Sequence, residues 1–375
     1  MPSRTAQRLL VGCFLAILWL PLAINATGRD GADAAAENRE LAAFPHLSGT
    51  IDSIARYADD FSRWFEDHFG LRSTLVRWYG ESRLFLLGVS PSTAVVNGRD
   101  DWFFYADDKA LEDYMSEDPL TPEGIANWRE ALVRARAWLQ ARHIAYVFLI
   151  APDKHFVYPE QMPPTILRVS AMSRTDQLYG GLQDTGFVVD VRPALLAAKA
   201  RERIYFKTDT HWNDRGALVA YQAIINAVRA QAPAVPAPWT REDFAPVTRV
   251  TEGGDLAAMM GLKRVLREED LALEPKRPRL SRVVEPAGAE KMAEEGRLVT
   301  EIPGSSLPRA VILRDSFTSR LVPFLSEHFS RAVYLWQNDF DAQVVEEEHP
   351  DVVIQEIVGR HLLGFIPSPE LVPDR

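Results

Sequence analysis

Short apolar segments alternate with helical segments from residue 121 to the end of the chain. Apolar runs occupy residues 145–151, 310–313 and 332–335, and largely apolar runs with one aspartate each occupy 187–191 and 351–354. Helical periodicity is found between and around them, at 121–141, 173–182, 215–231, 317–329 and 342–348. Strands that are apolar throughout are typical of parallel sheets covered on both faces. We therefore predict a three-layer α/β/α domain with a parallel sheet.

Helical and hairpin patterns precede this domain and extend it. Apolar residues recur on one helical face from Ile51 to Phe69, and a second helical stretch covers 71–87. Residues 94–105 predict a hairpin around Asn97-Gly98. Residues 263–307 are polar and rich in charge and proline, so we expect an irregular insertion there, or a small hairpin.

The N-terminus has the pattern of an export signal. Arg4 and Arg8 precede an apolar run over 9–26, which is slightly shorter than the about 20 apolar residues that span a bilayer. We predict a signal peptide or signal anchor at 1–28, a polar tether at 29–44 and the domain at 45–375. The basic flank is expected to stay in the cytoplasm and the domain to lie outside it. The alternative is a buried helix at the start of a soluble domain.

Charge and cysteine content exclude several classes of function. The 375 residues carry a formal net charge of −10, which argues against nucleic acid or an anionic membrane surface as the main partner. The single cysteine, Cys13, lies in the apolar run. The rest of the chain therefore has no disulfide, no thiolate metal site and no cysteine nucleophile. We expect neither a metal nor an organic cofactor.

Asp209 and His211 are the first candidate catalytic residues. They follow the short apolar segment 204–206 and precede a helix. In an extended segment, residues two apart point to the same side, so the carboxylate can orient the imidazole as a base. The alternatives are a structural histidine beside a turn aspartate, or a metal pair, for which a third clustered ligand is missing.

Ser316 is the candidate nucleophile. It lies where the apolar strand 310–313 runs into a helical segment, which exposes a hydroxyl at the edge of a sheet. The alternative is a helix N-cap. A third polar cluster, at 152–155, also follows a strand. The carboxyl ends of parallel strands share one edge, so Asp209, His211 and Ser316 are expected to converge. Three further residues near these positions are candidate substrate contacts: Lys154, Trp212 and Asp315.

The motifs together resemble one family. They are Pro152-Asp-Lys154, Asp209-Thr-His-Trp212 and Asp315-Ser-Phe317, with further similarity at 37–41, Pro45, 65–72, 97–104 and 350–354. This set is similar to the SGNH-hydrolase-like domain of the alginate O-acetyltransferases of the AlgJ and AlgX type. The resemblance implies that Asp209, His211 and Ser316 form the triad. It also implies a circularly reordered motif order, because ordinary SGNH hydrolases place the serine first.

The resemblance implies a periplasmic O-acetyltransferase, tethered to the inner membrane of a Gram-negative bacterium. Its acceptor would be an exopolysaccharide, and a membrane-bound O-acyltransferase would supply the acetyl groups. Two features depart from the family. Arg314 stands where the nucleophile motif commonly has glycine. The chain also ends soon after the last strand, so we expect it to lack the C-terminal carbohydrate-binding module of the AlgX type. The remaining alternatives are a carbohydrate esterase and a non-catalytic subunit of a secretion complex.

Overall fold

The computed structural model describes residues 4–27, 41–285 and 296–372. The chain divides into two compact units: residues 1–95 with 252–267, and residues 96–251 with 268–375. Most of the predicted tether at 29–44, the motif residues 37–40 and part of the predicted insertion (286–295) lie outside the described residues. The two units are taken in turn.

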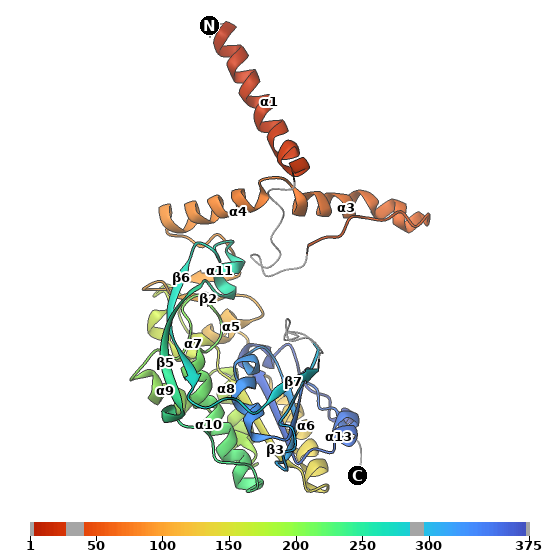
Figure 1. Cartoon of the computed structure of the whole chain (residues 1–375), viewed down its shortest axis with the longest axis vertical. Helices are drawn as coiled ribbons and strands as arrows, with labels where there is room; N and C mark the ends of the chain where they lie inside the picture. The colour runs from red at the N-terminus through yellow and green to blue at the C-terminus, as the bar shows by residue number, and fades with distance from the viewer. Residues whose placement is uncertain (1–3, 28–40, 286–295, 373–375) are drawn as a thin grey trace. The chain divides into compact units, whose positions relative to one another are not determined.

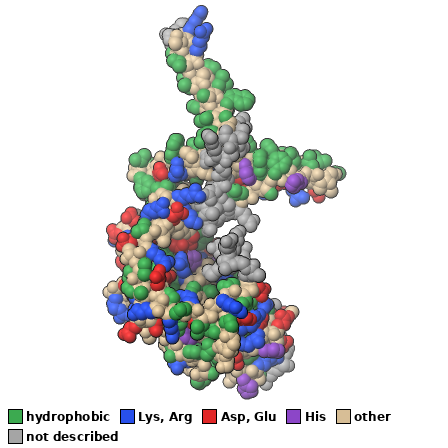
Figure 2. Space-filling model, in the orientation of Figure 1, with side chains coloured by type: hydrophobic (Ala, Val, Ile, Leu, Met, Phe, Trp, Pro, Cys, Tyr) green, Lys and Arg blue, Asp and Glu red, His purple; other side chains and the backbone are tan. Residues whose placement is uncertain are grey.

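The first unit is mainly helical. It contains α1 (Arg4–Thr27), α3 (Ile51–His68), α4 (Arg72–Glu81) with the π-helical turn η1 (Ser82–Leu86), and α11 (Asp255–Met259). The helix predicted from residue 51 is confirmed, and Thr50 caps it by accepting a hydrogen bond from Ser53 N–H. Aromatic rings stack along α3 from Tyr57 through Phe61 to Phe65. Figure 2 shows apolar side chains exposed along α1 and α3.

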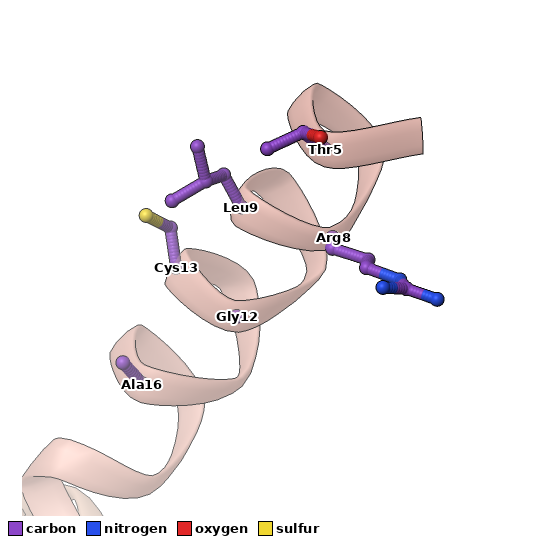
Figure 3. Close-up of a pocket in the computed structure, with 6 residues that line it drawn as sticks. All are labelled: Thr5, Arg8, Leu9, Gly12, Cys13 and Ala16. Atoms are coloured by element: carbon purple, nitrogen blue, oxygen red, sulfur yellow. The ribbon is translucent and has the colours of Figure 1, made fainter. Parts of the chain in front are cut away.

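The α1 helix carries the predicted signal segment. A shallow hollow on it is lined only by its own residues, and Figure 3 shows Arg8 pointing away from the side that carries Leu9 and Cys13. Among the described residues, no helix combines the length and apolar character needed to cross a membrane. Export and tethering remain predictions.

The second unit is built on a seven-stranded sheet with the order β4-β3-β11-β9-β10-β8-β7. Five neighbouring strands are parallel: β4 (Val188–Val189), β3 (Ala145–Ala151), β11 (Val352–Val358), β9 (Arg309–Arg314) and β10 (Arg331–Trp336). The edge strands β8 (Arg297–Glu301) and β7 (Arg282–Glu285) add antiparallel pairs. The predicted parallel α/β sheet is confirmed, and its antiparallel edge was not foreseen.

Helices cover both faces of this sheet. One face packs on α9 (Arg192–Lys199) and α10 (Asp214–Gln231), and the other on α6 (Pro122–Gln140), α8 (Arg174–Leu182) and α13 (Ala342–Glu348). Figure 1 shows α10 and α6 on opposite sides of the strands. The shorter helices of the unit are α5 (Ala110–Met115), α7 (Lys154–Val157) and α12 (Val322–Leu325). Thr121 caps α6 as predicted, accepting from Gly124 N–H.

Two sequence predictions need correction. The helix predicted over 317–329 is three short turns, η4 (Phe317–Arg320), α12 and η5 (Ser326–His328), with Pro323 in the first turn of α12. The segment predicted as an irregular insertion, or a small hairpin, contains β6 (Arg267–Pro275), β7 and β8, so the irregular description is wrong and the antiparallel pair of β7 and β8 agrees with the hairpin. β6 pairs with β5 (Phe244–Glu252), and β7 with β8. The hairpin of β1 (Val95–Asn97) and β2 (Phe103–Tyr105) is confirmed.

Candidate active site

Ser316 lies in the turn between β9 and η4. Its backbone has ordinary right-handed helical angles (φ −66°, ψ −27°), and its side chain makes no capping hydrogen bond. Its Oγ lies 2.7 Å from Nε2 of His211, which comes from a segment 105 residues earlier in the chain. The alternative that the Ser316 side chain caps a helix is therefore wrong.

Asp209 and His211 lie in a tight turn, not in the extended segment expected from the sequence. An isolated antiparallel bridge between Tyr205 and Trp212 closes the loop that contains them. Inside the loop, Asp209 Oδ1 accepts the backbone N–H of His211 at 2.9 Å and lies 2.7 Å from its Nδ1. With Nδ1–H directed at the carboxylate, Nε2 is the nitrogen that accepts the proton of Ser316.

The electrostatics of this pair favour a charged carboxylate. Burial by itself raises the pKa of Asp209, but the charge and the two hydrogen bonds of His211 outweigh it and hold the pKa well below its usual range. The guanidinium of Arg320 acts in the same direction. The side chains of Asp209 and His211 are each 18% exposed, so the group remains accessible from solvent. A serine, a base and an orienting carboxylate in this order can activate the hydroxyl as a nucleophile.

Trp212, which was predicted to contact substrate, is instead part of the core. Its side chain is fully buried, and its Nε1–H donates to the carbonyl of Phe317 at 3.1 Å. The Phe317 ring packs against both Trp212 and the imidazole of His211, with centroids 5.0 and 4.8 Å apart. Trp212 therefore joins the His211 loop to the turn that follows Ser316, because each contact spans the two segments.

Lys154 is also buried instead of facing substrate. Its ammonium donates to the backbone carbonyls of Phe206, Lys207 and Asp209 at 3.1, 3.1 and 2.7 Å. The side chain is 2% exposed and comes from the start of α7, directly after β3. The predicted substrate contact is thus replaced by a contact that holds the loop around Asp209 in place.

Asp315, the third predicted substrate contact, supports the nucleophile turn from inside. Its Oδ1 accepts the N–H of Phe317 at 2.9 Å, and its Oδ2 accepts the N–H of Val358 at 2.6 Å. With 4% of the residue exposed, the carboxyl group is directed into the protein. It connects the residue after Ser316 with the end of the neighbouring strand β11.

The arginine that replaces the usual glycine of the family motif is accommodated in the sheet. Arg314 is the last residue of β9 and is buried. Its Nη1 donates to Ser319 Oγ at 3.0 Å, and the guanidinium lies 4.6 Å from the ring centroid of Trp336. The side chain thus reaches past Ser316 to the next helical turn and braces the turn that carries the serine.

Two carboxylates on β6 support the Asp209 loop, and sequence reasoning missed both. Glu268 accepts the N–H groups of Lys207 and Thr208 at 2.7 and 3.0 Å and the hydroxyl of Thr208 at 2.6 Å. Asp270 accepts from Asn213 Nδ2 and Arg215 Nη2 at 3.1 and 2.6 Å. The sequence offered no signal for them, because residues 267–270 are all charged and 271–273 are apolar, without the alternation of a half-buried strand.

Comparison with known families supports the resemblance found in the motifs. Residues 95–343 match the family described as "SGNH hydrolase-like domain, acetyltransferase AlgX". The chain belongs to this AlgX family. The match includes Lys154, Asp209, His211 and Ser316, and it covers more than half of the 375 residues.

Two curated relatives align with this AlgX-family chain over a shorter stretch than the family match does. It is 33% identical over 144 residues to "Probable alginate O-acetylase AlgJ" of Pseudomonas putida, and 26% identical over 140 residues to the protein of the same name from Pseudomonas syringae pv. tomato. Each match covers 37% of this chain and 34% of the relative. The chain is thus aligned with about a third of each relative's length.

The fold also agrees with a solved structure. The structure of Bacillus cereus PatB1 superposes with a TM-score of 0.52 at 16% identity, covering 75% of this chain and 99% of that chain. At this identity the likeness is one of fold. It confirms the SGNH-like architecture expected from the order of strands and helices.

Proposed function

We propose that the chain is an O-acetyltransferase that moves acetyl groups onto polysaccharide hydroxyls through an acetylated Ser316. The observation that carries this proposal is the chain of contacts from Asp209 Oδ1 to His211 Nδ1 and from His211 Nε2 to Ser316 Oγ, each 2.7 Å long. Membership in an acetyltransferase family supports the same reaction.

In the first half-reaction, Ser316 Oγ attacks the carbonyl carbon of an acetyl donor. His211 Nε2 takes the hydroxyl proton, and the charge of Asp209 stabilises the imidazolium that forms. The tetrahedral intermediate then collapses and expels the donor's alcohol or other leaving group, which receives the proton back from His211. The product of this half-reaction is an acetyl ester of Ser316.

In the second half-reaction, a sugar hydroxyl attacks the acetyl ester. His211 removes its proton and returns it to Ser316 as the ester bond to the enzyme breaks. The N–H of Phe317 is already used by Asp315, so we assign the oxyanion of both tetrahedral intermediates to the N–H of Ser316 itself. Water in place of the sugar would make the same machinery an esterase.

The acceptor, the donor and the location are part of the proposal. The relatives' names speak of alginate O-acetylation, and we infer a polysaccharide of that kind as acceptor. We further propose that a membrane-bound O-acyltransferase supplies the acetyl groups, and that the reaction takes place in the periplasm. The arginines and apolar run at the N-terminus support export.

Trapping the acetyl-enzyme tests the proposal. The purified chain is mixed with a chromogenic acetyl ester and with candidate oligosaccharides, and both protein and sugars are examined by mass spectrometry. We expect an acetyl group on Ser316 and acetylated oligosaccharide, and neither with Ser316→Ala. Ser330→Ala is the control, because Ser330 precedes β10 at the opposite end of the strands. Acetate without acetylated sugar would favour an esterase, and turnover by Ser316→Ala would exclude the mechanism.

A further inference from the structure

A second pair of acidic side chains lies beneath the nucleophile turn. Glu356 is on the central strand β11 and only 1% of it is exposed. Its Oε2 accepts the N–H of Asp315 at 3.2 Å and the hydroxyl of Thr318 at 2.8 Å. These two residues stand on either side of the Ser316-Phe317 dipeptide. One carboxyl group therefore accepts hydrogen bonds from the residues before and after the Ser316-Phe317 dipeptide.

The partner of Glu356 is another carboxyl group. The two residues are in contact through the Asp315 N–H, which donates to Glu356 Oε2, and the negative charge of Asp315 acts on the Glu356 carboxyl group. Both oxygens of Asp315 already accept backbone N–H groups, from Phe317 and Val358. Glu356 Oε1 is buried and receives no hydrogen bond from the part of the protein that the structure describes. Two carboxylates facing each other cannot form a hydrogen bond unless one of them carries a proton.

We propose that Glu356 and Asp315 share one proton at neutral pH and that this carboxyl pair is a positioning element, which holds the turn carrying Ser316 in its reactive geometry. The inference rests on the proposed function, because it assigns a role toward Ser316. The proton bridges the two side chains, Asp315 keeps its two backbone donors, and Glu356 keeps Asp315 N–H and Thr318. Loss of the proton places two like charges inside the sheet and separates these contacts.

The surroundings agree with a neutral Glu356. Burial raises the pKa of Glu356 well above its usual range, and the negative charge of Asp315 raises it further. The hydroxyl of Thr318 and the N–H of Asp315 oppose this rise without reversing it. Other titratable or charged groups lie around the pair. His361 Nδ1 is 3.9 Å from Asp315 Oδ2, and the Tyr205 phenol interacts with Glu356 as well as with Asp153 and Arg360.

Proton uptake on folding gives a test that does not depend on activity. A glutamate that is protonated in the folded protein and ionised in the unfolded chain makes stability fall as pH rises above the ordinary glutamate range. Glutamine keeps the shape but has no such proton. Relative to the wild-type chain, Glu356→Gln should therefore gain melting temperature as pH is raised from about 5 to about 8.

Glu348 provides a matched control, for which the contribution of the carboxyl group to stability should change with pH in the opposite direction. Glu348 bonds Arg331, Arg309 and Arg297, and these contacts, with that to Arg331 the strongest, lower its pKa to about 2. Glu348→Gln should therefore lose melting temperature relative to wild type at neutral pH and approach it as pH falls. A Glu356→Gln advantage that is flat or falls with rising pH would overturn the shared proton. At neutral pH, an infrared spectrum of the wild-type chain should contain a protonated-carboxyl band that Glu356→Gln lacks. Absence of this difference would also overturn the shared proton.

The positioning role is tested in the full-length chain with a chromogenic acetyl ester. Removing the side chain in Glu356→Ala should lower kcat by about ten- to a hundredfold with a smaller change in KM. Glu356→Gln should recover most of that loss, because the amide can donate to Asp315 and accept from Thr318. Equal rates in the alanine variant and wild type would refute the positioning role. Failure of the wild-type chain to acetylate Ser316 would refute the proposed function instead, and the melting and infrared results would still decide the shared proton.

Discussion

The ammonium of Lys154 lies 2.7 Å from the backbone carbonyl oxygen of Asp209. Lys154 follows β3, whereas Asp209 belongs to a loop 55 residues further along the chain. The same ammonium binds two more carbonyls of that loop, those of Phe206 and Lys207. The position of the carboxylate that orients His211 therefore depends on a side chain that comes from a different segment of the chain.

Replacing Lys154 with methionine should damage both the loop and turnover. The variant keeps the length of the side chain but leaves three carbonyls without their donor, which costs about 1–3 kcal/mol of stability when such groups stay buried. We expect kcat on an acetyl ester to fall more than KM changes, because the base is displaced. Urea unfolding and initial rates measure the two effects.

Lys199→Met is the control for this change. Lys199 also binds a backbone carbonyl, that of Val157, together with Glu160, but it lies on α9. It should lose some stability and leave kcat nearly unchanged. If both lysine variants reduced kcat equally, the specific link between Lys154 and the Asp209 loop would be refuted.

Glu268 is expected to matter in the same way from the other side of the loop. In the wild-type chain both carboxylate oxygens of Glu268 accept N–H groups, one from Lys207 and one from Thr208. Glu268→Gln replaces one of these oxygens with an NH₂ group, which cannot accept a hydrogen bond, so at least one of the two contacts is lost. The free energy of unfolding should fall by about 1–3 kcal/mol, with a reduced kcat. Glu274→Gln on the same strand is the control, because Glu274 is half exposed and pairs with Arg249 at the surface. Indistinguishable behaviour of the two variants would exclude a supporting role for Glu268.

The sequence predicted the meeting of Asp209, His211 and Ser316 for a physical reason. Apolar strands and the helices between them require a parallel sheet, and a parallel sheet gathers the segments after its strands at one edge. That argument needs only the order of elements along the chain. It placed Ser316 after β9 correctly. The segment before Asp209 is not a strand of the sheet, because Tyr205 forms only an isolated bridge to Trp212, so the turn geometry of Asp209 and His211 did not follow from the order of elements.

The supporting residues were beyond this kind of reasoning. Glu268 lies 60 residues from Thr208 in a run of four charged residues, 267–270, and no local pattern distinguishes a carboxylate that binds a loop from one that faces water. Trp212 lies beside His211 in sequence, and that adjacency alone does not tell whether its side chain faces substrate or the core. Its burial depends on Phe317, which tertiary packing alone brings near.

The position of the domain relative to the membrane is a separate prediction. Arg4 and Arg8 ahead of the apolar run predict that residues after about Gly28 leave the cytoplasm. A reporter that is active only in the periplasm should be active when fused after Ala36. A cytoplasm-specific reporter at the same point should be silent, and the reverse pattern would exclude export. Replacing Arg4 and Arg8 with glutamate should weaken the periplasmic signal, since the positive flank sets the orientation.

Asp209→Asn separates the role of the charge from that of the shape. The amide can still accept the N–H of His211, but it can also present its NH₂ group to Nδ1 and stabilise the tautomer that carries its proton on Nε2. That tautomer cannot accept the proton of Ser316. We expect kcat to fall by roughly 10⁴-fold with substrate binding largely kept. Asp243→Asn is the control, because Asp243 accepts a backbone N–H in a comparable turn, that of Thr240, on another segment. It should leave kcat unchanged.

The pH dependence of the same variant gives an independent check. The folded-state pKa of Asp209 is lowered, so its charge stabilises the folded chain above the unfolded aspartate value of about 3.9 and ceases to do so as pH falls through the lower folded-state value. The stability difference between wild type and Asp209→Asn should therefore be largest near neutral pH and shrink below about pH 4. Wild-type turnover should fall earlier, as acid protonates the imidazole of His211 and removes the base. A variant as active as wild type, or a stability difference that grows on acidification, would contradict an ionised Asp209 that orients His211.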